Sequence, residues 1–345
     1  MKDSFIIIRS NRPSFSLWLD SRVPKTLLIL IILSLIAITV SISYGEYYIS
    51  PVDVIKTLWG FDTSSDFQFI INTLRLPRTL TAWLVGMGLA IAGCTMQTIT
   101  RNPLADPSII GINAGAGLAA VLFIVVFPSL PVALLPFSAF IGGILVALAI
   151  YAVAWQGENS IIRLILVGIG FNFIVSAITN IITTFGEINS VSQALIWLTG
   201  SVYGKTMPQV WILLPWILVF TLVTWIMSKE LNSLNLGDNL GLGLGLPLQK
   251  TQLTLLICSV ALSSASVSIA GAVGFIGLIA PHIARFLVGN THQGLIPVTG
   301  LVGGLLVVSA DLLGRLLFTP LELPCGIITA IIGVPYFIFL LSKSR

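Results

Sequence analysis

Long apolar runs separated by short polar segments make up most of this 345-residue chain. Runs such as residues 27–43, 211–227 and 326–341 each approach the roughly 20 residues that a helix needs to cross the hydrocarbon layer. They lack the polar face at helical period that the outer helices of a soluble protein would show. The pattern therefore predicts an all-α polytopic integral membrane protein.

The apolar runs predict about ten transmembrane helices. The predicted spans lie near residues 27–43, 79–98, 112–127, 134–155, 163–185, 210–227, 253–271, 275–288, 297–316 and 326–341. A polar N-terminal leader of residues 1–24 precedes the first span, and no small-residue cleavage site follows that span, so we expect it to be retained. Residues 25–345 are expected to form a single membrane domain.

Two predicted spans, near 112–127 and 275–288, are short and bordered by proline and glycine. The residues that mark these borders are Asn102, Pro103, Pro107, Gly277 and Pro281. Backbone that leaves the helix cannot face lipid, so these broken helices are expected to pack inside protein or line an aqueous path. They are the candidate residues of a translocation path.

A weak internal repeat relates the two halves of the chain. Residues 90–93 match residues 268–271 at an offset of 178, and Pro103 and Pro281 match at the same offset. The matched segments fall on spans of opposite direction, which predicts an inverted repeat. Coincidence is the alternative.

Composition and charge indicate how the bundle is oriented. Charged residues make up only 9% of the chain, far below the roughly 25% of soluble domains. Twelve of the 17 basic residues fall on the face that holds both termini, which the positive-inside bias identifies as the cytoplasm. These residues are Lys2, Arg9, Arg12, Arg22, Lys25, Arg101, Arg163, Lys229, Lys250, Arg285, Lys343 and Arg345. They are scattered, so the net charge of +4 does not predict nucleic-acid binding.

Five basic residues remain for the outer face, against this bias: Lys56, Arg75, Arg78, Lys205 and Arg315. Two of them flank a proline bend in the sequence Arg-Leu-Pro-Arg at 75–78. Arginine favours carboxylates because its planar guanidinium forms paired hydrogen bonds with them. With Arg315, these two are expected to form an outward cationic rim for an acidic partner or an anionic substrate. Contact with lipid headgroups is the alternative.

Asp311 and Arg315 are one helical turn apart near the outer end of a span, so they are predicted to form a structural ion pair. The alternative is that Asp311 and Asp106 relay protons in a proton-coupled secondary transporter. The only histidines, His282 and His292, have no Cys or carboxylate at ligand spacing, so no metal site is predicted.

The sequence Gly-Ser-Val-Tyr-Gly-Lys-Thr at 200–206 has one residue too few between its glycines for a phosphate-binding loop. Any ATP hydrolysis is therefore expected on a separate subunit. The glycine-rich stretch 237–245 lies between Lys229 and Lys250 and is the least membrane-like inner segment. It is expected to form a cytoplasmic connector at about 229–252.

Several ordered motifs resemble the FecCD family of permeases. They include Arg-Leu-Pro-Arg at 75–78, Asn-Pro-Leu-Ala-Asp-Pro at 102–107, the run from Gly274 to Arg285 and Glu-Leu-Pro at 322–324. The resemblance covers roughly residues 25–342.

The resemblance implies a permease subunit of a type II ABC importer in the bacterial inner membrane, carrying a ferric siderophore, haem or cobalamin. It implies a second permease subunit, as homodimer or heterodimer, and two ATP-binding cassette subunits that hold ATP and magnesium. A periplasmic or lipid-anchored binding protein would deliver the cargo, and lipid surrounds the bundle. The chain itself is expected to be a transporter, without enzyme activity or a bound cofactor.

The resemblance also implies roles for individual residues. Arg75, Arg78 and Arg315 match positions that meet acidic residues of the binding protein. The positions that match the ATPase coupling loop are Leu236, Gly237, Asp238, Gly241 and Gly245. The chain departs from the family in having glycines at 241 and 243, which each cost up to about 1 kcal/mol in a helix relative to alanine. A short or frayed first coupling helix is therefore expected.

Overall fold

Helices form nearly all of the structure, a computed structural model that describes residues 5–11, 14–45, 47–61, 64–154, 161–317 and 321–343. The leader contains an antiparallel hairpin of β1 (Phe5–Asn11) and β2 (Ser14–Asp20). The sequence did not predict this hairpin. Lys2, Arg12 and Arg345, predicted on the cytoplasmic face, lie outside the described residues.

Ten helices coincide with the ten predicted spans. They are α1 (Arg22–Ser43), α4 (Leu76–Thr100), α5 (Ile112–Val121), α6 (Leu135–Ala154), α7 (Ile161–Phe185), α9 (Met207–Ile226), α12 (Leu248–Ala270), α13 (Ile276–Val288), α14 (His292–Leu316) and α15 (Cys325–Lys343). Seven of the helical segments in the described part of the chain are long and apolar enough to cross a membrane, and three more are shorter and apolar. The prediction of an all-α bundle of about ten membrane helices is confirmed.

The structure adds short elements, most of which lie outside the predicted spans. They are α2 (Pro51–Leu58), α3 (Ser65–Phe69), η1 (Ile70–Arg75), η2 (Pro107–Ile110), η3 (Leu122–Val126), η4 (Val132–Leu134), α8 (Ile188–Leu198), α10 (Ser228–Asn235) and α11 (Asp238–Gly243). Local capping explains some of their boundaries. Ser50 accepts a hydrogen bond from the backbone N–H of Asp53 and Pro51 follows it, which is typical of a helix start.

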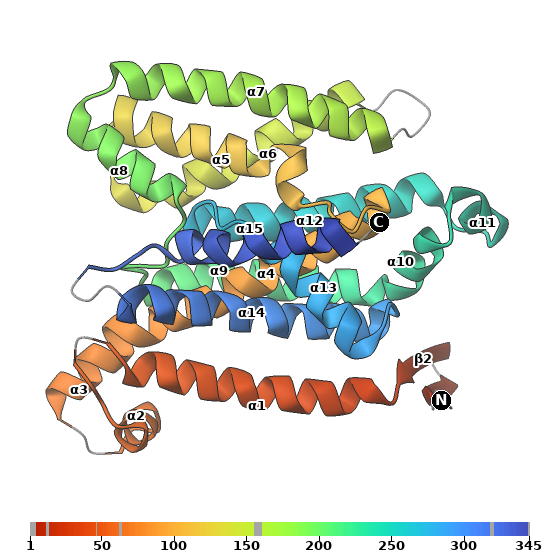
Figure 1. Cartoon of the computed structure of the whole chain (residues 1–345), viewed down its shortest axis with the longest axis horizontal. Coiled ribbons are helices and arrows are strands. Elements are labelled where there is room, and N and C mark those ends of the chain that lie inside the picture. Colours follow the sequence, from red (N-terminus) through yellow and green to blue (C-terminus); the bar gives the residue numbers. More distant parts are fainter. Residues whose placement is uncertain are drawn as a thin grey trace.

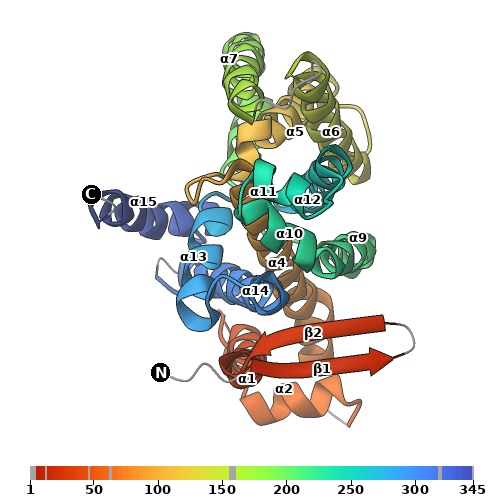
Figure 2. The same ribbon diagram turned by 90° about the vertical axis from the view of Figure 1, so that its right-hand side faces the viewer.

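Helix α4 runs through the centre of the bundle, with α9, α12, α13 and α14 around it (Figures 1 and 2). The most apolar window of the span that contains α4 is 83% buried, against 11% for α7. Helices α5, α6, α7 and α8 form a layer on one side of this core, and α1 with α2 and α3 lies on the other (Figure 1). The core is therefore α4 enclosed by other helices, while α7 in the outer layer is mostly exposed.

Glycine allows α4 to approach its neighbours closely. A Cβ atom added at Gly86 would overlap the carbonyl oxygen of Gly303 in α14, and one added at Gly93 would overlap that of Gly277 in α13. Small residues at such crossings permit backbone contact where lipid supplies no hydrophobic drive for helices to associate.

Both short spans are interrupted, as the sequence predicts. The 3₁₀ turn η2 precedes α5, which continues as the π-helical turn η3. On the other side, residues 271–274 leave the helical conformation and Phe275 has a positive φ of 67° before α13 begins. Both interruptions pack against neighbouring helices, as expected for backbone that leaves the helical conformation. That they line an aqueous path stays a prediction.

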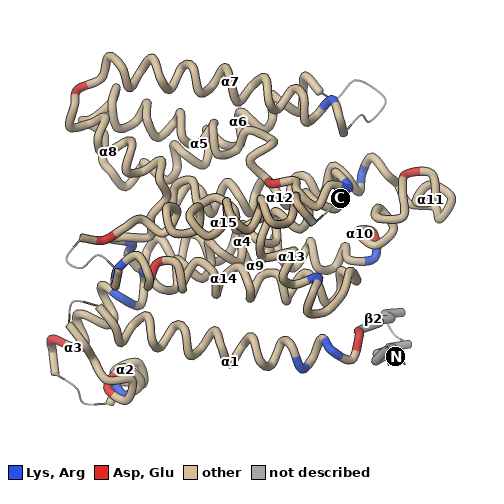
Figure 3. Tube along the Cα trace, viewed as in Figure 1, with Lys and Arg blue, Asp and Glu red and all other residues tan. Residues whose placement is uncertain are grey.

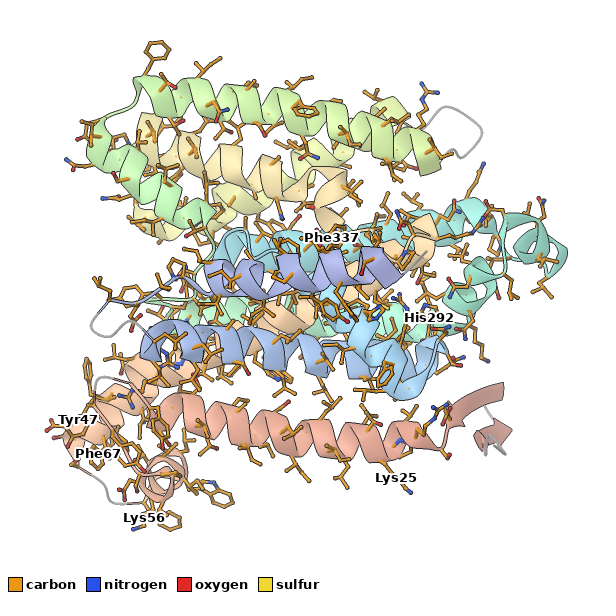
Figure 4. The ribbon with its side chains drawn as sticks, in the orientation of Figure 1. Lys25, Tyr47, Lys56, Phe67, His292 and Phe337 are labelled. Carbon is orange, nitrogen blue, oxygen red and sulfur yellow. The ribbon has the colours of Figure 1, made fainter. Side chains whose placement is uncertain are left out.

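The bundle has two distinct ends. We call the end with Arg75, Arg78 and Arg315 the arginine end, and the end with α10 and α11 the connector end. Both chain termini point toward the connector end (Figure 1), and basic residues occur at both ends (Figure 3). Lys25 and Lys56 mark opposite ends of the layer that contains α1 (Figure 4). Which end faces the cytoplasm stays a prediction.

Helices α4 and α12, which carry the proposed repeat, run in opposite directions. Arg101 directly follows α4 and pairs with Asp238, ten residues before α12 begins at Leu248. The last turn of α4 and the first turn of α12 therefore share the connector end. This antiparallel arrangement is what an inverted repeat requires, and the repeat itself stays a prediction.

Replacing Gly86 by alanine should destabilise the bundle, because the new methyl group would overlap backbone that cannot rotate away. We expect a loss of about 1–3 kcal/mol, seen as a lower melting temperature in detergent. The matched control is Gly170→Ala in α7, where nothing lies within 4 Å of the added Cβ. A Gly86→Ala protein as stable as Gly170→Ala would contradict the close α4–α14 contact.

Candidate functional site

Arg75 closes the end of α1. Its Nη1 donates hydrogen bonds to the carbonyl oxygens of Ile42 at 2.6 Å and Ser43 at 3.0 Å, and its Nη2 donates to the carbonyl of Tyr47. The last carbonyls of a helix lack partners within it, and a cation there also interacts favourably with the helix dipole. Arg75 therefore joins the π-helical segment before α4 to the C-terminus of α1.

Arg78, in the first turn of α4, binds Asp311 of α14. Its Nε lies 3.1 and 3.0 Å from the two carboxylate oxygens, and its Nη2 donates to Oδ1 at 2.7 Å. Its remaining Nη1 donates to Glu322 at 2.8 Å. The Arg78 guanidinium also lies 5.4 Å from the ring centroid of Tyr203. One arginine thus links α4, α14 and the segment that precedes α15.

Arg315 completes the cluster from one turn beyond Asp311. Its Nε lies 3.3 Å from Asp311 Oδ2, which confirms the spacing-based pairing of these two residues as a contact. Its Nη2 donates to the carbonyl and the hydroxyl of Ser41 at 3.0 and 2.6 Å. Arg315 therefore ties α14 to the same end of α1 that Arg75 caps.

These five charged residues, Arg75, Arg78, Arg315, Asp311 and Glu322, form one unit that we call the arginine cluster. The three arginines are each 6–8% exposed and Asp311 is 2% exposed, whereas the side chain of Glu322 is 30% exposed. Three cations against two carboxylates leave one excess positive charge. Burial of ions is costly unless partners compensate them, and here the hydrogen bonds do so.

The structure corrects one expectation about these arginines. The structure brings Arg75, Arg78 and Arg315 to one end of the bundle, but their guanidinium groups turn into the protein and do not form an exposed rim. The cause is that folding brings the free carbonyls at the end of α1 and the carboxylate of Asp311 within hydrogen-bond reach. The exposed members of this region are Glu322 and Tyr203, and Tyr203 is 67% exposed.

A hollow of about 540 Å³ adjoins the cluster at the arginine end. Its lining includes Phe127, which directly follows η3, Gln193 and Trp197 of α8, and Tyr203 and Lys205 of the loop after α8. Burial lowers the pKa of the Lys205 ammonium, because desolvation disfavours its charged form. Sequence reasoning missed this hollow because α8 is too short to register as a span.

The connector end carries a compact turn. Gly237 has φ 108° and separates α10 from α11, and Gly245 has φ 80° after α11, so both positions favour glycine. Asp238 forms an ion pair with Arg101 of the segment that follows α4. Helix α11 spans only six residues, which agrees with the expectation of a short helix around Gly241.

Leucines dominate the exposed surface of this connector. Leu236, Leu240, Leu242 and Leu244 are each between 56% and 68% exposed. A groove of about 440 Å³, lined in part by Leu244, lies between α10, the turn at 244–247 and the first turns of α12. Apolar side chains so exposed and so close together are typical of a surface that another protein covers.

The broken-helix residues fall into two groups. Pro107 starts η2 beside Gly277, where an added Cβ would lie 3.1 Å from the proline ring, and Gln97 donates a hydrogen bond to the Gly277 carbonyl at 3.0 Å. Pro281 follows one turn later, buried in α13. Asn102 and Pro103 are exposed beyond the end of α4 instead. The structure thus joins Pro107 and Gly277, and leaves Asn102 and Pro103 outside this contact.

Asp311 and Asp106 do not meet. Asp106 approaches Gly277, which touches Gly93 of α4, whereas Asp311 binds Arg78. Gly93 lies 15 residues beyond Arg78, which is about 22 Å along a helix. The structure therefore offers no direct proton relay between these two carboxylates.

No group of three or more metal-binding side chains occurs within the part of the chain that the structure describes. His292 is held by Thr98 and Asn232, and the ring of His282 lies 5.9 Å from that of Tyr336. The contacts of both histidines are therefore with polar or aromatic side chains of neighbouring helices.

Comparisons with known proteins agree over most of the chain. The sequence profile of the FecCD transport family matches residues 26–343. The chain is 42% identical over 324 residues to Probable siderophore transport system permease protein YfhA of Bacillus subtilis (strain 168), covering 92% of this chain and 94% of that protein. It is 38% identical over 337 residues to Iron(3+)-hydroxamate import system permease protein FhuG of the same organism, covering 95% and 100%.

A solved structure is similar as well. A metal-chelate type ABC transporter in an inward-facing conformation matches with a TM-score of 0.84 and 30% sequence identity, covering 93% of this chain and 99% of that one. Both the arginine cluster and the connector lie inside the matched part of the sequence.

Replacing Asp311 by asparagine should destabilise the protein strongly, because Arg78 and Arg315 would lose the carboxylate that they share. Removing one partner of a buried ion pair costs about 3–5 kcal/mol, so the detergent melting temperature should fall sharply. Asp66→Asn, in the exposed α3 near the same end, is the control and should leave the melting temperature unchanged. Equal stability of the two variants would contradict a compensating role for Asp311.

Proposed function

Because the chain belongs to the FecCD transport family, we propose that it is the membrane-spanning permease of a binding-protein-dependent ABC import system. Its cargo in this proposal is a ferric siderophore or a similar metal chelate. The observation that carries the proposal is the match of residues 26–343, which includes both ends of the bundle. The similar proteins named above are permeases for siderophores and for iron hydroxamates.

Energy comes from separate ATP-binding cassette subunits in this proposal. Residues 200–206 form a turn after α8 and lack the preceding strand of a phosphate-binding loop. The exposed leucines of the connector and the groove beside them support a docking site for such a subunit. The ion pair between Arg101 and Asp238 then links the docked connector to the end of α4.

A second permease subunit, identical or related, completes the path. Helix α7 supports this part of the proposal, because its apolar window is only 11% buried within the single chain. The hollow beside Lys205 and Tyr203 opens at the arginine end, where we propose that cargo arrives from the binding protein. The connector end then faces the cytoplasm.

The binding protein docks at the arginine end through the cluster. Arg78 is turned inward, yet its Nη1 holds Glu322, and that carboxylate is the partly exposed member of the pair. An acidic side chain of the binding protein reaches Arg78 by displacing Glu322, and the one excess positive charge of the cluster favours this exchange. Buried Arg75 and Arg315 support the exchange by keeping Arg78 and Asp311 in place.

Replacing Glu322 by glutamine should therefore strengthen docking of the binding protein, because a competitor for Arg78 is weakened. An exposed ion pair contributes up to about 1 kcal/mol, so the dissociation constant should fall by up to about fivefold. Surface plasmon resonance on the permease complex in nanodiscs measures this, with Asp66→Asn in the exposed α3 as the control. Weaker binding in the Glu322→Gln protein would reject displacement and indicate that Glu322 supports docking directly.

Proteoliposomes that hold the chain with its ATPase subunits and binding protein separate the two classes of transporter. With ATP on the connector side and no proton gradient, we expect uptake of the ferric chelate, because ATP hydrolysis alone drives import. A proton gradient without ATP should give none. Uptake that needs the gradient and ignores ATP would instead support the proton-coupled alternative through Asp311 and Asp106.

A further inference from the structure

His292 occupies a junction of three helices near the connector end (Figure 4). It is the first residue of α14 and is 1% exposed. Its Nδ1 lies 2.7 Å from Asn232 Oδ1 in α10, and its Nε2 lies 2.9 Å from Thr98 Oγ1 in α4. One side chain therefore bridges α10, the first helix of the connector, to the central helix α4.

The protons of this junction follow from its geometry. The backbone N–H of His292 donates to Asn232 Oδ1 at 3.0 Å. Nδ2 of Asn232 donates to Gln293 Oε1 at 2.8 Å, so both bonds fix the orientation of the Asn232 amide. Since Asn232 presents an acceptor, Nδ1 of His292 carries the hydrogen. In the neutral ring, Nε2 is an acceptor for the Thr98 hydroxyl, whose single proton also has the Cys94 carbonyl within reach at 2.9 Å. Hydrogen-bonded contacts thus run without a break from Asn232 of α10 through His292 to Thr98 of α4.

Neighbouring contacts hold the same elements together. Trp225, at the end of α9, donates from Nε1 to the carbonyl of Gln293 at 2.9 Å. Arg101 donates from Nε to the carbonyl of Leu234 at 3.2 Å and pairs with Asp238. The start of the connector is therefore fixed to α4 on one side and to α14 on the other.

Helix α4 extends from this junction to the arginine cluster. Thr98 lies 20 residues after Arg78 on one continuous helix, which corresponds to about 30 Å. Close backbone contacts at Gly86 and Gly93 fasten α4 along this length. A displacement at the connector that reaches Thr98 is thus passed on by a rigid element whose other end holds Arg78.

We propose that His292 is a positioning residue for coupling: together with Asn232 and Thr98 it makes the connector and α4 move as one body. This inference rests on the proposed function, in which a binding protein docks at one end of α4 and an ATPase at the other. Docking at the arginine cluster then changes ATP hydrolysis through the His292 junction. Coupling of two sites through a packed element of this kind typically amounts to at least about a fivefold effect.

Thr98→Val tests the junction with the smallest change of shape. The matched control is Thr95→Val, because Thr95 is equally buried on α4 and its hydroxyl binds only the Ile91 carbonyl of its own helix, at 2.8 Å. In nanodiscs that contain the complete transporter, Thr98→Val should lower stimulation of ATP hydrolysis by the binding protein about fivefold or more. Basal hydrolysis and co-purification of the ATPase should not change. Thr95→Val should behave as the unmodified protein.

A second variant and a second measurement keep the test decisive. Asn232→Leu removes the α10 side of the junction, and the double variant with Thr98→Val should show no further loss, since both break one connection. Hydrogen exchange on the permease alone should show faster exchange in α10 and α11 for Thr98→Val and not for Thr95→Val. Full stimulation in Thr98→Val, additive losses in the double variant, or equal exchange in both threonine variants would overturn the proposal.

The two proposals fail in different ways. If the unmodified protein shows no ATP-driven uptake stimulated by a binding protein, the proposed function is wrong, whatever the variants do. If the unmodified protein transports normally and Thr98→Val transports equally well with full stimulation, only the role of the His292 junction is wrong.

Discussion

Asp311 is shared by Arg78 and Arg315, and the placement of three helices depends on this one carboxylate. A buried guanidinium in a membrane bundle requires a compensating charge, and Asp311 serves two of them at once. Because Arg78 belongs to α4 and Arg315 also holds the end of α1, the cluster fixes α1, α4 and α14 relative to one another. The same contacts leave Arg78 with one donor directed at Glu322, which is the least buried member.

Helix α4 joins the two ends at which partners are proposed to act. Its first turn carries Arg78, and its last turns carry Thr98 and lead to Arg101. Glycine contacts with α13 and α14 along its length leave no room for it to bend independently of them. A change in its position therefore involves the core of the bundle, while the layer of α5 to α8 contacts that core mainly through α12. This division suits a transporter that moves as a few rigid parts.

Sequence predicted the ten membrane helices because a run of apolar residues long enough to cross lipid is a strong local signal. It also predicted the Asp311–Arg315 contact, because a spacing of one turn places both on one face. The Arg78–Asp311 pair spans 233 residues, and nothing local to Arg78 indicates which carboxylate it meets. The inward turn of the arginines was missed for the same reason, since the free carbonyls of α1 become neighbours only after folding. Short α8 and α10 gave no membrane-length signal.

The distance along the chain between Arg78 and Asp311 also bears on biosynthesis. At the roughly 5–20 residues per second of translation, the 233 residues between them take roughly 10–50 s to be made. During that interval the first half of the protein has left the ribosome with an arginine whose counterion does not yet exist. Its long side chain can extend to lipid phosphates in the meantime. Final seating of α4 thus waits for the late arrival of α14, and assembly is completed from the C-terminal half.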